Sequence, residues 1–193
     1  VLSQRKIIAI GFGTPILILV LALSFGISRD KENASSPGVQ DTLKIVDLPF
    51  ESAPNLEIET LDGQVVTLNN FKGKILVIDF WSSWCGPCKS EGAMLGEAYR
   101  DWKDSGVEFI GIAVWDQQNS VKDFIIRNKI DYANAIDDGS TAVEWGVRGV
   151  PEKFFITGDG RIYKKIVGPN TKKSLDKILK ELTDNALGIP HNS

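Results

Sequence analysis

Both cysteines of the 193-residue chain lie in the segment 80–91, as Cys85-Gly-Pro-Cys88. A Cys-x-x-Cys pair that follows an apolar run (Ile75–Phe80) and opens a helical pattern is typical of a redox dithiol, provided that the surrounding elements are of the βαβ type. The helix N-terminus lowers the pKa of a thiol from about 8.5 toward neutral, so Cys85 is the predicted nucleophile. Pro87 suits a first helical turn. Cys88, one turn further, is the predicted resolving thiol.

A static or inert disulfide is the alternative, but this spacing at a strand-to-helix junction is poor for joining distant segments. A metal site is disfavoured, because two thiols and the single histidine, His191, do not supply the four ligands of a closed zinc site. The pair would therefore act as its own redox centre, without a cofactor.

The periodicity of the chain predicts the elements that would position these cysteines. Apolar runs predict strands, and apolar residues at three-and-four spacing predict helices. The expected order is a hairpin over 56–68, a strand over 75–80, a helix over 85–104, a strand over 107–114, a helix capped by Ser120, a strand over 132–136, a helix over 142–145, a hairpin over 154–167 and a helix over 171–186. Right-handed crossovers then favour an α/β fold, with a central mixed sheet and helices on both of its faces.

The first part of the chain has a different character. Residues 7–27 carry no charge, and 21 helical residues at about 1.5 Å each would span a membrane. We expect a transmembrane anchor with residues 1–6 in the cytoplasm and the rest outside it, and a cleaved signal is the alternative. The polar residues 28–47 predict a flexible linker. We expect residues 48–187 to form the folded domain and residues 188–193 to form a tail.

Composition excludes one class of partner. The 22 basic and 25 acidic residues give a net charge of −3. No basic cluster larger than Lys172-Lys173 occurs, so nothing indicates nucleic acid binding.

Two motifs carry a family resemblance. The stretch 77–89 resembles the thioredoxin active-site signature, and Gly149-Val-Pro151 looks like the cis-proline loop that faces it. The resemblance covers about 49–186. The anchor, the first hairpin and the extra helix make the chain similar to the membrane-anchored, extracytoplasmic thiol–disulfide oxidoreductases of the CcmG/DsbE, ResA and TlpA type. Ala93 stands where many relatives have proline.

The resemblance implies roles for several residues. Pro151 would be cis and, with Val150, would pair with the substrate backbone; an ordinary trans turn is the alternative. Asp79 would be a buried acid and a candidate base for Cys88, or else the partner of a buried lysine. Glu152 could instead tune the thiols, and the sequence does not rank the two acids.

The tryptophans that flank the motif divide into two kinds. Trp84 is expected to form part of the contact surface, whereas Trp81 is expected to pack. The implied activity is reduction of protein disulfides outside the cytoplasm, commonly for cytochrome c maturation, with a membrane electron donor of the CcdA/DsbD type. The alternatives are an oxidant of folding exported proteins, a peroxidase and a non-catalytic chaperone that binds apocytochrome.

Overall fold

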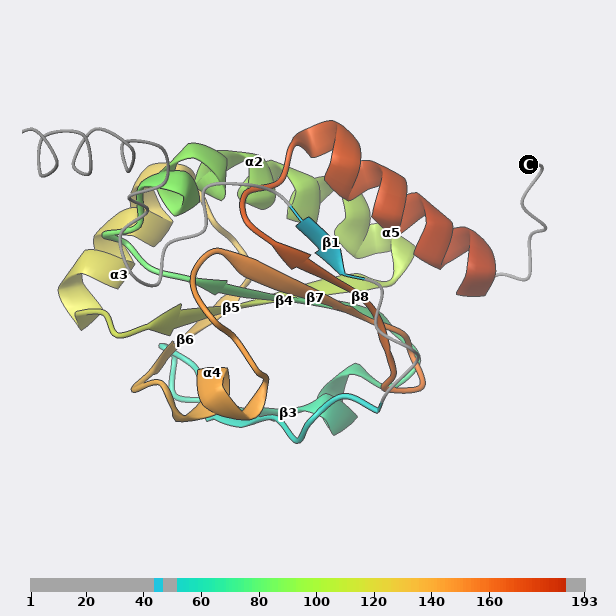
Figure 1. Ribbon diagram of the computed structural model, residues 1–193, viewed down its shortest axis with the longest axis horizontal. Helices are drawn as coiled ribbons and strands as arrows, with labels where there is room; N and C mark the ends of the chain where they lie inside the picture. Colours follow the sequence, from blue (N-terminus) through green and yellow to red (C-terminus); the bar gives the residue numbers. More distant parts are fainter. Residues whose placement is uncertain (1–43, 47–51, 187–193) are drawn as a thin grey trace, which may run out of the picture. The chain divides into compact units, whose positions relative to one another are not determined.

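A six-stranded mixed sheet lies at the centre of the computed structural model, which describes residues 44–46 and 52–186 (Figure 1). Its strands are, in spatial order, β1 (Lys44–Val46), β8 (Ile162–Val167), β7 (Glu152–Ile156), β4 (Ile75–Trp81), β5 (Val107–Val114) and β6 (Ala133–Asp137). β4, β5 and β6 run parallel, and β7, β8 and β1 add antiparallel pairs. Every residue of β4 is buried, because the strand lies in the interior of the sheet and is covered on both faces. All of its residues except Asp79 are apolar.

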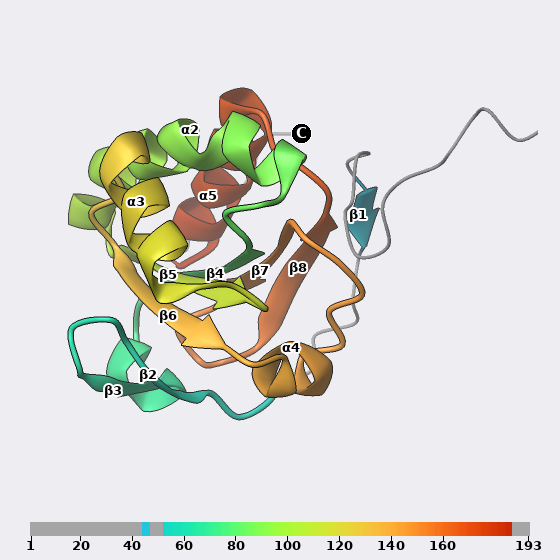
Figure 2. The ribbon, with the colours of Figure 1, turned by 90° about the vertical axis from the view of Figure 1, so that its left-hand side faces the viewer.

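Helices lie on both faces of this sheet, as Figure 2 shows from the side. The helices α2 (Gly86–Trp102), α3 (Gln118–Asn128) and α5 (Lys172–Ala186) cover one face, and the short helix α4 (Ser140–Glu144) lies on the other. Two single 3₁₀ turns, η1 (Leu68–Phe71) and η2 (Lys103–Ser105), precede β4 and β5. The α/β, thioredoxin-like fold class is therefore confirmed.

The hairpin predicted before the first sheet strand is present. Its strands β2 (Glu57–Glu59) and β3 (Val65–Thr67) pair antiparallel as a separate sheet. Thr60 bridges to Ala135, and the Leu61 N–H donates to the Asn134 carbonyl at 2.7 Å. The hairpin thus covers the edge strand β6, which would otherwise present unpaired backbone groups.

Two boundaries differ from the expectation. Residues 44–46, assigned to the linker 28–47, form β1 and pair with β8. Three residues are too few to show a period, so only the available sheet edge reveals this strand. α3 begins at Gln118 rather than after Ser120, which is therefore not its cap. The Asp116 carboxylate accepts the Gln117 N–H at 2.7 Å, so a donor at the start of the helix is already satisfied.

The expected membrane segment, residues 7–27, and the tail lie outside the described residues. Within 44–46 and 52–186, none of the helices has the length and apolar character needed to cross a membrane.

Candidate active site

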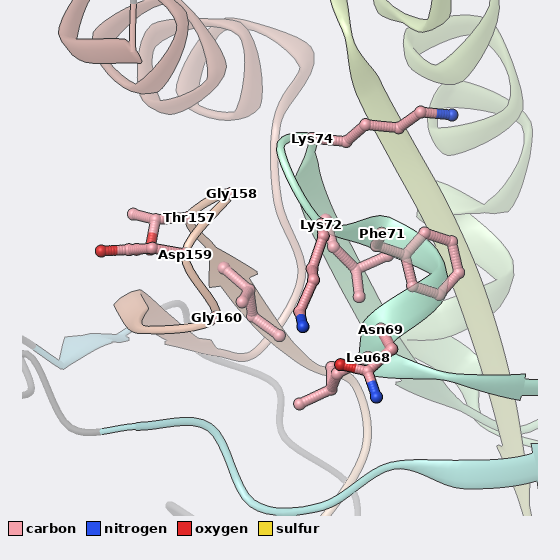
Figure 3. Close-up of a pocket in the computed structure, with 11 residues that line it drawn as sticks. Leu68, Asn69, Phe71, Lys72, Lys74, Thr157, Gly158, Asp159 and Gly160 are labelled. Atoms are coloured by element: carbon pink, nitrogen blue, oxygen red, sulfur yellow. The ribbon is translucent and has the colours of Figure 1, made fainter.

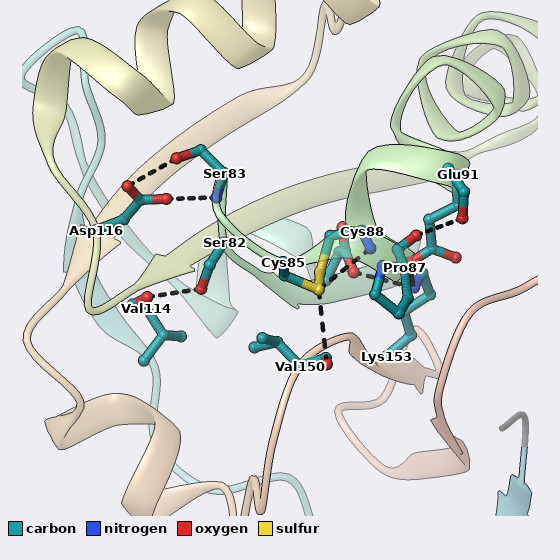
Figure 4. The surroundings of a disulfide bond; sticks show 12 residues. Ser82, Ser83, Cys85, Pro87, Cys88, Glu91, Val114, Asp116, Val150 and Lys153 are labelled. Atoms are coloured by element: carbon teal, nitrogen blue, oxygen red, sulfur yellow. Dashed lines mark hydrogen bonds and ion pairs between the residues drawn. A yellow bond between two sulfur atoms is a disulfide. The ribbon is translucent and has the colours of Figure 1, made fainter. Parts of the chain in front are cut away.

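Cys85 and Cys88 form a disulfide at the N-terminus of α2 (Figure 4). Cys85 is the N-cap residue, and its sulfur accepts the Cys88 N–H at 3.2 Å. Pro87 lies in the first turn, where no N–H is needed. In the reduced state the same N–H and the helix dipole would stabilise negative charge on the Cys85 sulfur. Both cysteines are buried, so exposure does not distinguish an outer from an inner thiol in this oxidised form.

The loop before β7 faces the disulfide. The Val150–Pro151 peptide bond is cis, as the resemblance implied. The Val150 carbonyl oxygen lies 3.7 Å from Cys85 Sγ (Figure 4). A disulfide sulfur has no proton to donate, so this is a contact that could become a hydrogen bond once Cys85 is reduced.

The segment 82–84, which leads into Cys85, is fixed to the end of β5. The Ser82 hydroxyl donates to the Val114 carbonyl at 2.7 Å. The N–H and hydroxyl of Ser83 donate to the two carboxylate oxygens of Asp116, at 2.5 and 2.9 Å. These bonds link the turn after β4 to the turn after β5, so the N-cap cysteine has a defined position.

Beneath the disulfide, one buried lysine pairs with two buried acids. Lys153 Nζ donates to Glu91 Oε1 at 2.5 Å and lies 3.2 Å from Asp79 Oδ1, an ion pair without hydrogen-bond geometry. The Lys153 side chain is 0% exposed, and the two carboxylates are 4% and 2% exposed. The other oxygen of Glu91 accepts the Asn170 N–H at 2.7 Å. We call Asp79, Lys153 and Glu91 the buried charge cluster.

Burial dominates the titration of this cluster. It raises the pKa of Asp79 and of Glu91 above their usual values, against the attraction of the Lys153 ammonium. For Lys153, burial acts to lower the pKa, but the two carboxylates outweigh it and the pKa is raised. Lys153 therefore stays charged, and the carboxyl groups hold protons to higher pH than exposed acids do.

Glu152 belongs to a different arrangement. Successive strand residues point to opposite faces, so Glu152 and Lys153 point away from each other. Glu152 is 0% exposed; its Oε2 lies 2.6 Å from Lys165 Nζ and its Oε1 accepts the Arg148 N–H at 3.0 Å. Lys165 also donates to the Gly146 carbonyl at 2.9 Å. These contacts fasten the loop 146–151 that carries Pro151.

The sequence located most of this site but missed its counterions. Cys85, Cys88, Pro87, Val150 and Pro151 come together as expected. Trp84 is 44% exposed beside Cys85, and Trp81 is buried, with its indole N–H 3.2 Å from Asn134. Asp79 does have a buried lysine partner, the second of the two possibilities.

Lys153 and Glu91 were not predicted as site residues. The available signal was a lysine within the apolar segment 153–156, because a buried lysine needs an acid.

Other features of the described residues are separate from this chemistry. A pocket of about 390 Å³ lies at the opposite end of β4, between η1 and the turn after β7 (Figure 3). Leu68, Phe71, Leu76 and Ile156 contribute its apolar lining. No cluster of three or more histidine, cysteine or acidic residues placed to hold a metal occurs in 44–46 and 52–186.

A Cys-x-x-Cys disulfide at the start of a helix, after the central strand of a thioredoxin-like sheet and facing a cis-proline, defines a thiol–disulfide oxidoreductase. The chain belongs to the AhpC/TSA family, whose model matches residues 49–165.

Named relatives agree with this class. "Thiol-disulfide oxidoreductase ResA" of Bacillus thuringiensis subsp. konkukian (strain 97-27) is 34% identical over 134 residues, which are 69% of this chain and 78% of that protein. ResA of Bacillus subtilis (strain 168) is 27% identical over 161 residues, 83% and 85% of the two chains. The crystal structure of a thiol:disulfide interchange protein from Chlorobium tepidum TLS aligns with a TM-score of 0.65 and 28% identity, over 72% of this chain and 99% of that one.

Proposed function

We propose that this chain reduces disulfides of exported proteins outside the cytoplasm, in cytochrome c biogenesis. One observation carries the proposal: the Cys85–Cys88 disulfide at a helix N-terminus, with the Val150 carbonyl 3.7 Å from the sulfur of Cys85. This arrangement offers a nucleophile, a resolving thiol and a backbone edge for a substrate strand at one point. No other component is required for a two-electron exchange of disulfides.

The reaction begins with the reduced enzyme. The Cys85 thiolate attacks one sulfur of the substrate disulfide, forming a mixed disulfide and releasing the other substrate sulfur as a thiolate that takes up a proton. The Cys88 thiolate then attacks the sulfur of Cys85. The second substrate thiolate leaves and is protonated, and the Cys85–Cys88 disulfide forms. Two electrons and two protons have moved to the substrate, and a second dithiol must return them to the enzyme.

The buried charge cluster supports the proton transfers. Cys88 must lose a proton before it attacks, and a carboxylate whose pKa is raised is a stronger base for that proton than an exposed carboxylate. Asp79 and Glu91 both have raised pKa values. We assign acceptance of the Cys88 proton to the buried charge cluster, and Asp79 is the base that the family resemblance implies.

The location and the electron donor belong to the proposal as well. The uncharged segment 7–27 supports a tether that holds the domain outside the cytoplasm. Relatives named ResA, and one from Rhizobium leguminosarum bv. viciae named thiol:disulfide interchange protein CycY, support a role in disulfide exchange. The donor would be a membrane protein of the CcdA/DsbD type, and apocytochrome c or its maturation factors the substrates.

Trapping tests the proposal. In Cys88→Ala, the mixed disulfide with Cys85 cannot be resolved, so substrate proteins should remain attached to the full chain in cells. Cys85→Ala is the matched control and should trap far fewer partners. Recovery of cytochrome c maturation proteins with Cys88→Ala alone is the expected result. Equal capture by the two variants would contradict the assignment of Cys85 as nucleophile.

The direction of electron flow needs a separate measurement. The reduction potential of the Cys85/Cys88 couple is expected near that of thioredoxin, about −270 mV, rather than near that of the strong oxidant DsbA, about −120 mV. Equilibration with glutathione buffers gives this value. A potential close to the oxidant would favour the alternative, an oxidant of folding exported proteins.

A further inference from the structure

Two tryptophans beside the disulfide are exposed to solvent. Trp84 is 44% exposed and Trp115 is 52% exposed. Two neighbouring exposed indoles are more informative than a single exposed apolar side chain, because contiguous apolar patches mark interaction sites and tryptophan is enriched where proteins bind other proteins. Trp115 was not singled out by the sequence, and no step of the disulfide exchange uses it.

The topology of the sheet brings these rings together. The parallel strands β4, β5 and β6 end at the same edge, and the residues that follow them include Trp84, Trp115 and Gly139, respectively. The Trp84 indole N–H donates to the Trp115 carbonyl at 3.2 Å. The carboxyl edge of a parallel sheet is where ligands of α/β folds usually bind.

The absence of a side chain at Gly139 leaves room for the Trp115 ring. A Cβ at this position would lie 2.4 Å from Trp115 Nε1, so only glycine allows the ring to lie against the turn after β6. Gly139 has φ +111°, which also favours glycine. Trp115 itself is left-handed, with φ +52°, and its N–H donates to the Asp137 carbonyl at 3.1 Å. We call the exposed rings of Trp84 and Trp115 the indole surface.

Negative charge borders the indole surface. Asp116 follows Trp115 directly and holds Ser83 through its carboxylate. Asp138 precedes Gly139 and is exposed. The Ser140 N–H donates to its carboxylate at 2.9 Å and lowers its pKa, so Asp138 stays ionised at neutral pH. An indole face is itself electron-rich and attracts cations.

We propose that the indole surface binds a lysine or arginine side chain that lies near the disulfide cysteine in the protein substrate. The ring of Trp115 would stack on the aliphatic stem and cationic head, Asp138 and Asp116 would supply complementary charge, and Trp84 would join this contact to Cys85. The inference rests on the proposed function in one respect, namely that the substrate is a protein disulfide. It adds a preference for basic sequences around that disulfide.

The test compares two peptides that contain the same disulfide, one flanked by lysine and one by glutamate. The readout is the ratio of their kcat/KM values with the reduced full chain. The wild-type ratio should favour the lysine peptide and should fall with added salt, because exposed charges are screened. In Trp115→Ala the ratio should fall about two- to fivefold, the range expected for a cation on an exposed indole. Asp138→Asn keeps the turn and should lower the ratio by about twofold.

Matched controls lie elsewhere on the surface. Ile126→Ala removes a side chain that is 73% exposed on α3, and Asp104→Asn removes an exposed carboxylate at the other edge of the sheet. Neither should change the ratio. A ratio that is unchanged in both Trp115→Ala and Asp138→Asn would overturn the proposal.

Binding separates this inference from the proposed function. The double variant Cys85→Ser, Cys88→Ser cannot turn over, but calorimetry can still measure its affinity for reduced forms of the two peptides. If the double variant prefers the lysine peptide but the wild type does not reduce either peptide, the proposed role of the indole surface is supported and the proposed reductase function is contradicted. If the wild type reduces both peptides but the double variant shows no preference between them, the reductase function is supported and the proposed role of the indole surface is contradicted.

Discussion

Replacement of Lys153 by methionine tests the energetics of the buried charge cluster. Methionine keeps the length and volume of the side chain but leaves Asp79 and Glu91 buried without a cation. Removal of one partner from a buried ion pair costs about 3–5 kcal/mol. A domain of this size has about 5–15 kcal/mol of stability, so the variant should still fold but should unfold at lower urea concentration.

The loss should depend on pH in a defined direction. The pKa of Asp79 and of Glu91 is already raised in the folded protein, and loss of the lysine raises it further. A carboxyl group whose pKa is higher in the folded than in the unfolded state stabilises the fold fully at pH values below its unfolded pKa, near 4. This stabilisation is lost as the pH rises toward the pKa of the group in the folded state. Each proton released on unfolding weakens stability by about 1.36 kcal/mol per pH unit.

The difference between wild type and Lys153→Met should therefore be larger at pH 8 than at pH 5. Urea unfolding followed by far-ultraviolet circular dichroism at both pH values measures it. Lys74→Met, which breaks the exposed pair of Lys74 with Glu108, is the control and should show a much smaller loss without pH dependence. An equal loss for Lys153→Met at the two pH values would refute the reasoning.

Two further changes test individual contacts. Asp79→Asn removes a buried acid with a raised pKa, while Lys153 keeps its ion pair with Glu91. The stability of this variant relative to wild type should therefore rise between pH 4 and pH 8 in the same urea assay. A fall over this range would contradict the raised pKa of Asp79. Gly96→Ala places a Cβ 2.7 Å from the Lys129 carbonyl oxygen, and the overpacking should cost about 1–3 kcal/mol, more than the gain of about 1 kcal/mol in helix propensity. Gly86→Ala, where an added Cβ meets nothing within 4 Å, is its control in thermal unfolding and should not be destabilised.

The parts of the fold that follow from local pattern were predictable. β4 and β5 are apolar runs interrupted only by Asp79 and Glu108, and the apolar stripe of α5 is buried as its spacing requires. Cys85 and Cys88 are close in sequence, so their pairing needs no knowledge of the fold. The cis bond at Pro151 came from the family resemblance rather than from any period in the sequence.

The parts that depend on register were not predictable. Lys153 meets Asp79 because β7 runs antiparallel to β4 in the one register that places these residues opposite each other. A sequence shows neither the neighbour of a strand nor its register. The same holds for Trp115, which meets Gly139 only because β5 and β6 end side by side.

The two acids that the sequence left unranked, Asp79 and Glu152, lie in different surroundings. Glu152 pairs with Lys165 and fixes the loop 146–151. The buried charge cluster instead contacts all three elements that form the redox site: Asp79 lies on β4, Glu91 on α2 one turn after Cys88, and Lys153 on β7 after Pro151. Gain or loss of a proton there alters the field at the helix that carries both cysteines and at the strand that follows the cis-proline loop. The buried charge cluster is therefore better placed than Glu152 to couple protonation to disulfide exchange.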